Sequence, residues 1–201
     1  MDVSLVDRQA LVLAAEETLA DRLAQAVLPR PKPSVWMILL PPLFVFFALD
    51  MQRHKKEAKI FADGFLFTKR LALKLAGEAA AQGGAAPAVV FPDPPSEIGT
   101  PAAWERIRAA QAKEVALLQE HYGRLLAAQG ATYAGLVQGA YGTPGEYLAF
   151  CNALRQAEAA VNACMLEEIH TTAAAKEATA AMENALEELR LEQMRRIFGM
   201  R

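Results

Sequence analysis

The chain has 201 residues, with 21 Lys and Arg against 23 Asp and Glu and a formal net charge of −2 at pH 7. This balance argues against nucleic acid as a partner, because duplex-binding proteins carry a basic excess that displaces counterions. A hydrophobic share of 53% and a mean hydropathy of +0.11 exclude a disordered chain. Two cysteines exclude a disulfide-stapled scaffold, and the length allows one ordinary domain or two small ones.

The first segment, residues 2–28, is predicted to be an amphipathic helix. Apolar side chains recur along one side at helical spacing, among them Leu5, Val12, Leu19 and Leu23. Three prolines within residues 29–33 then impose an extended connector, because proline fixes φ and removes a backbone donor.

Residues 35–49, VWMILLPPLFVFFAL, carry no charge. As a straight helix they would cross about 22 Å of a hydrocarbon core that is ~30 Å thick, and Pro41 and Pro42 break such a helix at its centre. Cations flank both ends, whereas a spanning helix has its positive excess on one side. We therefore expect a proline-broken apolar wedge that enters a membrane from its cytoplasmic face. The alternatives are a buried core helix and a true membrane span.

The predicted membrane contacts are apolar side chains of this wedge: Trp36, Ile38, Leu40, Leu43, Phe44, Phe46 and Phe47. The predicted contacts to lipid headgroups are cations before and after it: Arg30, Lys32, Arg53, Lys55, Lys56 and Lys59. After the wedge, the chain is expected to continue as one helix over residues 42–81. This helix has Phe61 and Leu75 on its apolar stripe and Arg70 and Lys74 on a basic face that suits anionic headgroups.

Residues 82–99 contain four prolines and a glycine pair without periodicity. This composition predicts a flexible linker between a membrane-associating part, residues 1–81, and a second part, residues 100–201. The second part is predicted to be a helical hairpin, whose first arm opens at Thr100 and Pro101. Its second arm opens at the capping-box pattern of residues 143–146 and continues to about Phe198. The predicted fold class is therefore all-α, with long antiparallel helices in a four-helix arrangement, a C-terminal hairpin and a proline-broken apolar helix.

Glu114, His121 and Glu168 form a candidate polar interior. In a hairpin that folds near Gly142, Glu114 and Glu168 would lie within about one helical turn of each other. The Glu-x-x-His match at residues 167–170 falls short of the paired motifs that di-metal bundles use, so no metal site is assigned. Glutamates at the edge of an apolar stripe are more often solvated or ion-paired than ligands.

Cys151 and Cys164 are predicted to lie on one helix, about 20 Å apart along its axis, which excludes a disulfide between them. We expect both to be buried or half-buried in a reducing compartment. The chain has no phosphate-binding glycine loop, dinucleotide fingerprint, G-x-S-x-G or C-x-x-C motif. These absences favour a protein without a cofactor and without enzymatic activity, but they do not exclude catalysis.

The preferred function is a non-enzymatic scaffold or adaptor on the cytoplasmic face of a membrane, attached to an anionic leaflet by the wedge and its cations. Exposed Leu, Met and Ile side chains along the last helix are expected to form a seam for a protein partner or a second copy. A small subunit of a membrane complex fits the same features. The alternative is a soluble cytoplasmic four-helix bundle that holds a metal or a small ligand in its interior.

Overall fold

The computed structural model describes residues 3–27, 57–83, 87–91, 100–168 and 172–200. Within these ranges the chain is all-α, as predicted, with six helices and no strand. The helices are α1 (Leu5–Val27), α3 (Glu57–Gln82), α4 (Pro101–Ala127), α5 (Tyr133–Tyr141), α6 (Pro144–Glu168) and α7 (Ala173–Phe198). The predicted wedge, its seven membrane contacts and the headgroup cations other than Lys59 lie outside the described residues.

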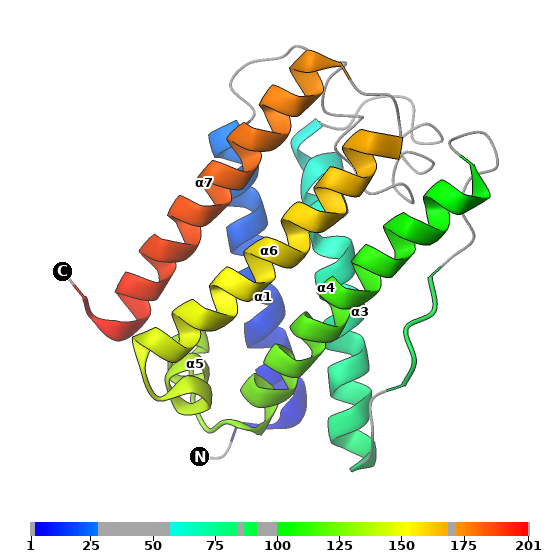
Figure 1. The fold of residues 1–201 in the computed structure, drawn as a ribbon. Helices are drawn as coiled ribbons and strands as arrows, with labels where there is room; N and C mark the ends of the chain where they lie inside the picture. Colours follow the sequence, from blue (N-terminus) through cyan, green and yellow to red (C-terminus); the bar gives the residue numbers. More distant parts are fainter. Residues whose placement is uncertain (1–2, 28–56, 84–86, 92–99, 169–171, 201) are drawn as a thin grey trace.

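Five long helices form a closed ring, in the order α1, α3, α4, α6 and α7, with α7 packed back against α1 (Figure 1). The short helix α5 lies at one end of the ring and contacts α1, α4, α6 and α7. Neighbouring helices are antiparallel except α3 and α4, which run in the same direction. The described bundle therefore has five long helices where the sequence predicts four.

The predicted second arm of the hairpin is two antiparallel helices, α6 and α7. Helix α6 ends at Glu168, and Thr172 caps α7 by accepting a hydrogen bond from the backbone N–H of Ala175 at 3.3 Å. Threonine is a favoured N-cap because its side-chain oxygen pairs a backbone donor that the helix leaves unpaired. Alanine-rich sequence follows at once, so the helical pattern continues past this break and does not reveal it.

A long connection joins α3 to α4 because these parallel neighbours begin at the same end of the bundle (Figure 1). After the 26 residues of α3, the chain has to return over about 40 Å before α4 can begin. Residues 87–91 are part of this return, and their Val89 and Phe91 side chains pack against the main core. The predicted linker thus connects helices of one bundle, and its described part adds to the core.

The core is made from the apolar stripes that the sequence predicts. The predicted stripe of α4 is buried: Trp104, Ile107, Val115, Leu118, Tyr122 and Leu125. The predicted stripe of α6 and α7 is buried as well: Tyr147, Leu154, Val161, Met165, Leu186 and Ile197. The largest core cluster draws residues from all six helices, so the segments on both sides of the predicted linker share one core.

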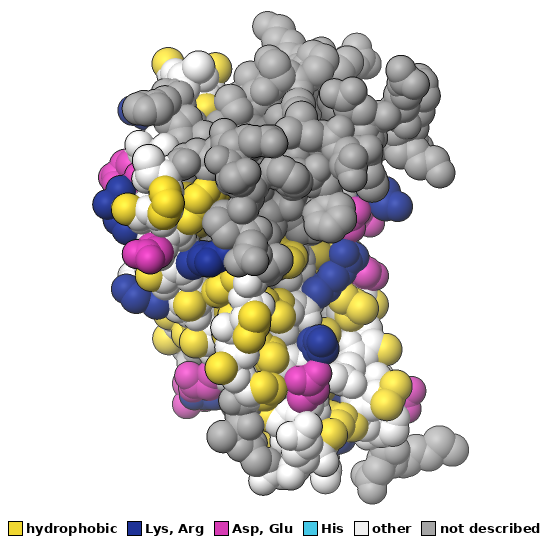
Figure 2. Space-filling view, turned by 90° about the vertical axis from the view of Figure 1, so that its right-hand side faces the viewer, with side chains coloured by type: hydrophobic (Ala, Val, Ile, Leu, Met, Phe, Trp, Pro, Cys, Tyr) yellow, Lys and Arg dark blue, Asp and Glu magenta, His cyan; other side chains and the backbone are white. Residues whose placement is uncertain are grey.

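The outer surface is mixed in charge. On α3, Phe61 and Leu75 are buried, whereas Lys59, Arg70 and Lys74 are exposed, as the predicted stripe and basic face require. Figure 2 shows the side that lies to the right in Figure 1, where hydrophobic side chains are interspersed with side chains of both charges. In the described chain, no helix combines the length and the hydropathy that a membrane span needs.

The Leu, Met and Ile side chains that were predicted to form a seam on α7 pack inside the bundle. Leu186, Met194 and Ile197 are buried, and Met182, Leu189 and Leu191 are half-buried against neighbouring helices. None of these side chains is exposed in the way that the seam requires. Within its described residues, helix α7 therefore offers no free apolar surface for a partner or a second copy. An interface along this helix stays a prediction.

Gly130 lies where the loop between α4 and α5 approaches the first turn of α5. A Cβ atom at Gly130 would lie 2.7 Å from the carbonyl carbon of Gly135 and 2.7 Å from the backbone nitrogen of Leu136. We therefore expect Gly130→Ala to lower the free energy of unfolding by about 1–3 kcal/mol, because the backbone has to move.

Gly123→Ala is the matched control. Gly123 lies within α4, and a Cβ atom there meets nothing within 4 Å. The control is expected to raise the free energy of unfolding by about 0.5–1 kcal/mol, because alanine favours a helix over glycine. Urea denaturation of both variants measures the difference, and effects of the same sign and size would contradict the close approach at Gly130.

Candidate functional site

A cavity lies inside the ring, between α3, α4, α6 and α7. Its volume is about 100 Å³. Apolar side chains line most of it, among them Phe61, Phe65, Leu148, Met182, Leu186 and Leu191. Polar residues from all four helices converge on the same space: Lys69, Gln111, Glu114, Glu158 and Arg190.

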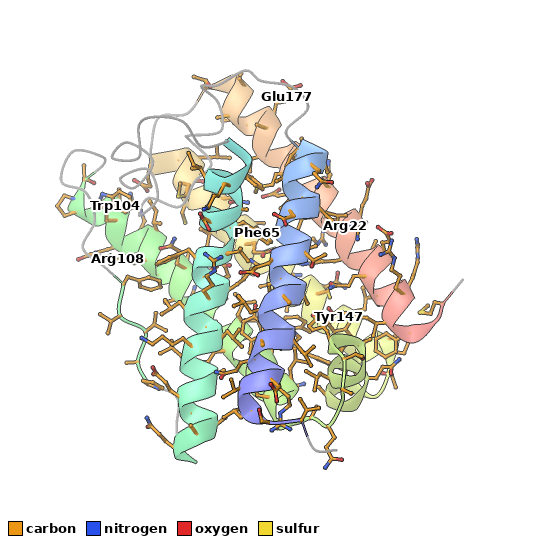
Figure 3. The ribbon with its side chains drawn as sticks, turned by 180° about the vertical axis from the view of Figure 1, so that it is seen from behind. Arg22, Phe65, Trp104, Arg108, Tyr147 and Glu177 are labelled. Carbon is orange, nitrogen blue, oxygen red and sulfur yellow. The ribbon has the colours of Figure 1, made fainter. Side chains whose placement is uncertain are left out.

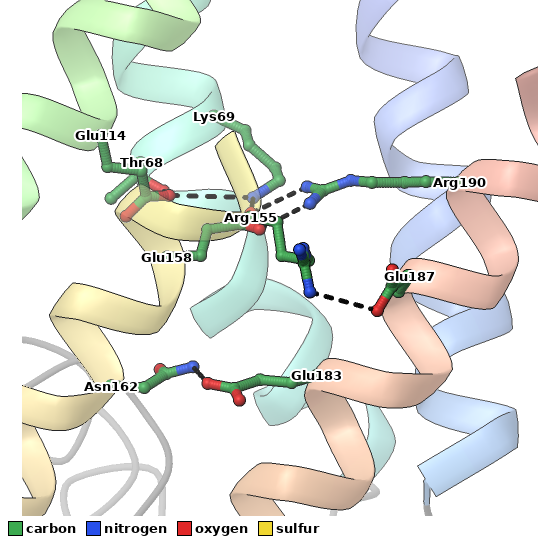
Figure 4. Close-up of polar contacts among 9 residues, drawn as sticks. All are labelled: Thr68, Lys69, Glu114, Arg155, Glu158, Asn162, Glu183, Glu187 and Arg190. Atoms are coloured by element: carbon green, nitrogen blue, oxygen red, sulfur yellow. Dashed lines mark hydrogen bonds and ion pairs between the residues drawn. The ribbon is translucent and has the colours of Figure 1, made fainter. Parts of the chain in front are cut away.

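An ion pair between α6 and α7 forms the centre of the polar group (Figure 4). Arg190 donates from both terminal nitrogens to the two carboxylate oxygens of Glu158, at 2.6 and 2.8 Å. The two side chains are 8% and 13% exposed. This two-point geometry is the strongest arrangement of arginine and carboxylate, and it fixes both side chains.

Lys69 brings a second cation to Glu158 from α3. Its Nζ donates to Oε1 of Glu158 at 3.2 Å and lies 3.9 Å from Oε1 of Glu114. The ammonium also lies 3.8 Å from the centroid of the Phe65 ring. The Lys69 side chain is 3% exposed, so water hardly reaches its ammonium. The two carboxylates replace water as the polar partners of this charge.

Glu114 joins α4 to α3 through a hydrogen bond from Oγ1 of Thr68 to its Oε1, at 2.7 Å. Burial raises the pKa of Glu114 above its ordinary value, although the nearby Lys69 ammonium opposes the change. Burial would also raise the pKa of Glu158, but Arg190 and Lys69 outweigh it and lower that pKa to about 2. Glu158 is therefore a fixed anion, whereas burial works against the ionised form of Glu114.

Two further pairs between α6 and α7 border the cavity (Figure 4). Arg155 lies 3.4 Å from a carboxylate oxygen of Glu187, with side chains 49% and 43% exposed. Asn162 donates to Glu183 at 2.9 Å. The exposed Arg155–Glu187 ion pair contributes about 0–1 kcal/mol to stability, whereas the Asn162–Glu183 contact is a part-buried hydrogen bond.

The structure places the three predicted interior residues apart. Glu114 belongs to the cavity, and Glu168 is paired with Arg106 near the start of α4. His121 lies toward α5, where its Nδ1 is 2.6 Å from the hydroxyl oxygen of Tyr141. Glu158 instead lies close to Glu114, because α5 takes up part of the predicted turn and shifts the register of α6 against α4.

His121 belongs to an aromatic cluster at the α5 end of the bundle. Its ring stacks on Phe150 with centroids 3.9 Å apart, and Tyr141 and Tyr147 lie beside it. Figure 3 shows Tyr147 at this end, with Trp104 near the opposite end. Burial, together with the charges of Arg190 and Arg124, lowers the pKa of His121 to about 3. The imidazole is therefore neutral at physiological pH.

The described residues hold no cluster for a metal ion, and Cys151 is not an activated thiol. No group of three His, Cys, Asp or Glu side chains within them is placed to hold a metal ion. Cys151 and Cys164 are free, both on α6 as predicted. Burial raises the pKa of Cys151 to about 11, so it is a neutral thiol at physiological pH rather than an activated nucleophile.

Comparison of the chain with protein-family models, with curated proteins and with solved structures finds no match. A function for the chain must therefore be inferred from the geometry of the cavity and from the sequence.

Proposed function

We propose that the chain is a non-enzymatic helical bundle that binds a small, largely apolar molecule in the cavity between α3, α4, α6 and α7. The observation that carries this proposal is the convergence of Lys69, Glu114, Glu158 and Arg190 on a cavity with apolar walls. Small-molecule sites in proteins have this composition: apolar walls give affinity, and a few placed polar groups give orientation. Shifted pKa values at such a cavity are a further mark of binding sites.

A purely structural role explains these charges less well. A buried ion pair costs desolvation that its attraction does not clearly repay, and apolar residues of similar size often stabilise a core as well or better. The described helices here bury two cations and two carboxyl groups beside unfilled space. Recognition of a ligand gives these groups a use that packing alone does not.

The test is isothermal titration calorimetry of the full chain with 1-octanol, a neutral and mostly apolar probe. We expect binding near one molecule per chain. Met182→Trp, which places a bulky ring at the cavity lining, is expected to weaken binding about tenfold or more. Val6→Trp is the control, because Val6 is 71% exposed on α1 and does not line the cavity. Equal binding by the two variants would contradict the cavity as the site.

Attachment to an anionic membrane, as a scaffold, an adaptor or a subunit of a membrane complex, is the second candidate function. The uncharged residues 35–49 between flanking cations favour it. The helices on either side of these residues add a geometric argument. Helix α1 ends, and helix α3 begins, at the same end of the bundle (Figure 1). Helices α4 and α7 also begin at that end. A membrane contact made by residues 28–56 would hold the ring by that end, and Lys59 is exposed near it.

Flotation with vesicles that contain phosphatidylserine tests the attachment. The full chain is expected to float, and less so in high salt, because salt screens the contact between cations and headgroups. Replacement of Phe44, Phe46 and Phe47 by serine is expected to abolish flotation, whereas replacement of all three by leucine preserves it. Undiminished flotation of the serine variant would contradict the role of the wedge.

A further inference from the structure

One buried polar group at the cavity, the side-chain amide nitrogen of Gln111, has no hydrogen-bond partner among the described residues. Gln111, on α4, is 2% exposed and lines the cavity, and its Nε2 is buried without a hydrogen bond to any described group. A side-chain amide nitrogen carries two N–H donors, and a buried donor without an acceptor is costly to keep. Gln111 precedes Glu114 by one turn of the same helix, so its amide lies on the face that carries the ion cluster.

Lys69 has unused donors beside the same cavity. Its ammonium carries three N–H groups, and within the described part of the chain its one hydrogen bond goes to Glu158. The contact with Glu114, at 3.9 Å, is an ion pair that is too long for a hydrogen bond. Gln111 and Lys69 therefore offer unpaired donors from two helices, which is the arrangement that an oxygen acceptor on a ligand requires.

The charges around the cavity favour an anionic acceptor. Deep in the site, Lys69 and Arg190 are set against the fixed anion Glu158, and burial raises the pKa of Glu114, which favours its neutral form. Arg190 is held by both carboxylate oxygens of Glu158, whereas the Lys69 ammonium keeps donors for a further acceptor, and a cationic donor pairs most strongly with an anion. At the rim, Arg155 is paired with Glu187, and Glu183 accepts from Asn162 in a part-buried contact. A rim charge is screened more than the deep charges are.

We propose that the ligand is an apolar monocarboxylate, whose carboxylate accepts hydrogen bonds from Gln111 and Lys69 and whose hydrocarbon part lies against Phe61, Phe65 and Leu186. This inference rests on the proposed ligand-binding function and names the chemical class of the ligand. A carboxylate suits the site because its two oxygens can each take a donor, one from each helix.

The experiment compares three probes that share an eight-carbon chain: sodium octanoate, 1-octanol and octylammonium chloride. Each is titrated into the full chain in a calorimeter at pH 7. Octanoate is expected to bind with one molecule per chain, and the neutral and cationic probes about tenfold more weakly or worse, because they lose a charge-assisted contact.

Gln111→Leu is the variant that tests the head-group contact, because it removes the unpaired amide and keeps a similar volume. It is expected to preserve or raise the stability of the free protein and to weaken octanoate binding about tenfold. Gln119→Leu is the matched control: Gln119 is also on α4 and also has a buried Nε2 without a partner, but it does not line the cavity. The control is expected to leave octanoate affinity unchanged.

The outcomes separate the ligand class from the proposed function. Equal affinity for the three probes, or unchanged octanoate affinity in Gln111→Leu, would overturn the carboxylate while the cavity stays a binding site. Tighter binding of octylammonium would assign the opposite charge to the ligand. If none of the three probes binds at millimolar concentration, both the ligand class and the proposed function fail.

Discussion

Replacement of Glu158 by glutamine is expected to lower the free energy of unfolding by about 3–5 kcal/mol, the effect of breaking a buried ion pair from one side. Glu158 is the anion that Arg190 and Lys69 share, and both cations are nearly buried. The amide that replaces it is neutral, so Arg190 loses its carboxylate partner away from water, and Lys69 keeps only the longer contact with Glu114. The free energy is therefore lost mainly because buried cations lack a carboxylate partner, and less because one contact is missing.

Glu187→Gln and Glu114→Gln are the controls for this prediction. Glu187 pairs with Arg155 at the surface, so its replacement is expected to cost less than about 1 kcal/mol. Glu114 is favoured in its neutral form by burial, which raises its pKa, so an amide is a closer substitute there than at position 158. Urea denaturation at pH 7 ranks the three variants, and a cost for Glu158→Gln as small as that of Glu187→Gln would contradict the shared-anion arrangement.

Apolar periodicity was sufficient to predict the helices and the faces that they bury, because side chains three and four residues apart lie on one side of a helix. It was not sufficient to predict the break between α6 and α7. The residues that follow Thr172 are strong helix formers, and alanine alone carries little information on which face is inside.

Of the charged residues of the site, Glu114 was predicted, whereas Glu158 and Arg190 escaped prediction although their positions carry a signal. Glu158 lies four residues after Leu154 and three before Val161, and all three side chains face the interior. Arg190 lies in the same way between Leu186 and Met194. A charge in phase with an apolar stripe is ambiguous by itself, since long side chains often reach solvent from such positions. Only the packing of α6 against α7 shows that these two charges neutralise each other.

The register of the hairpin explains why Glu168 was predicted near Glu114. A turn centred on Gly142 assumes one uninterrupted first arm, whereas α5 forms a separate helix that lies at the end of the ring. The glycines around α5 signal a weakened helix, but they do not say how many residues the turn consumes. Because α5 shifts α6 against α4, Glu158 rather than Glu168 lines the cavity, and Glu168 pairs with Arg106.

Acidification from pH 7 to pH 4 is expected to cost the folded state about 3 kcal/mol through His121 alone. Its pKa is lowered to about 3 in the fold, from 6.5 in an unfolded chain. Below pH 6.5 the unfolded chain therefore binds a proton that the folded chain does not, and stability falls as pH decreases toward 3. Burial is the main cause, and the cations Arg190 and Arg124 add to it, while Tyr141 contacts the ring as a neutral phenol.

His121→Gln isolates this contribution, because glutamine keeps a polar group near Tyr141 and does not titrate. The variant is expected to be less stable than the natural chain at pH 7, since it loses the stack on Phe150, but to lose about 3 kcal/mol less between pH 7 and pH 4. Other histidines and carboxyl groups titrate in both proteins, so their contributions cancel when the two pH profiles of unfolding free energy are subtracted. Parallel profiles would show that the imidazole takes up its proton equally in both states, and they would contradict a buried, neutral His121.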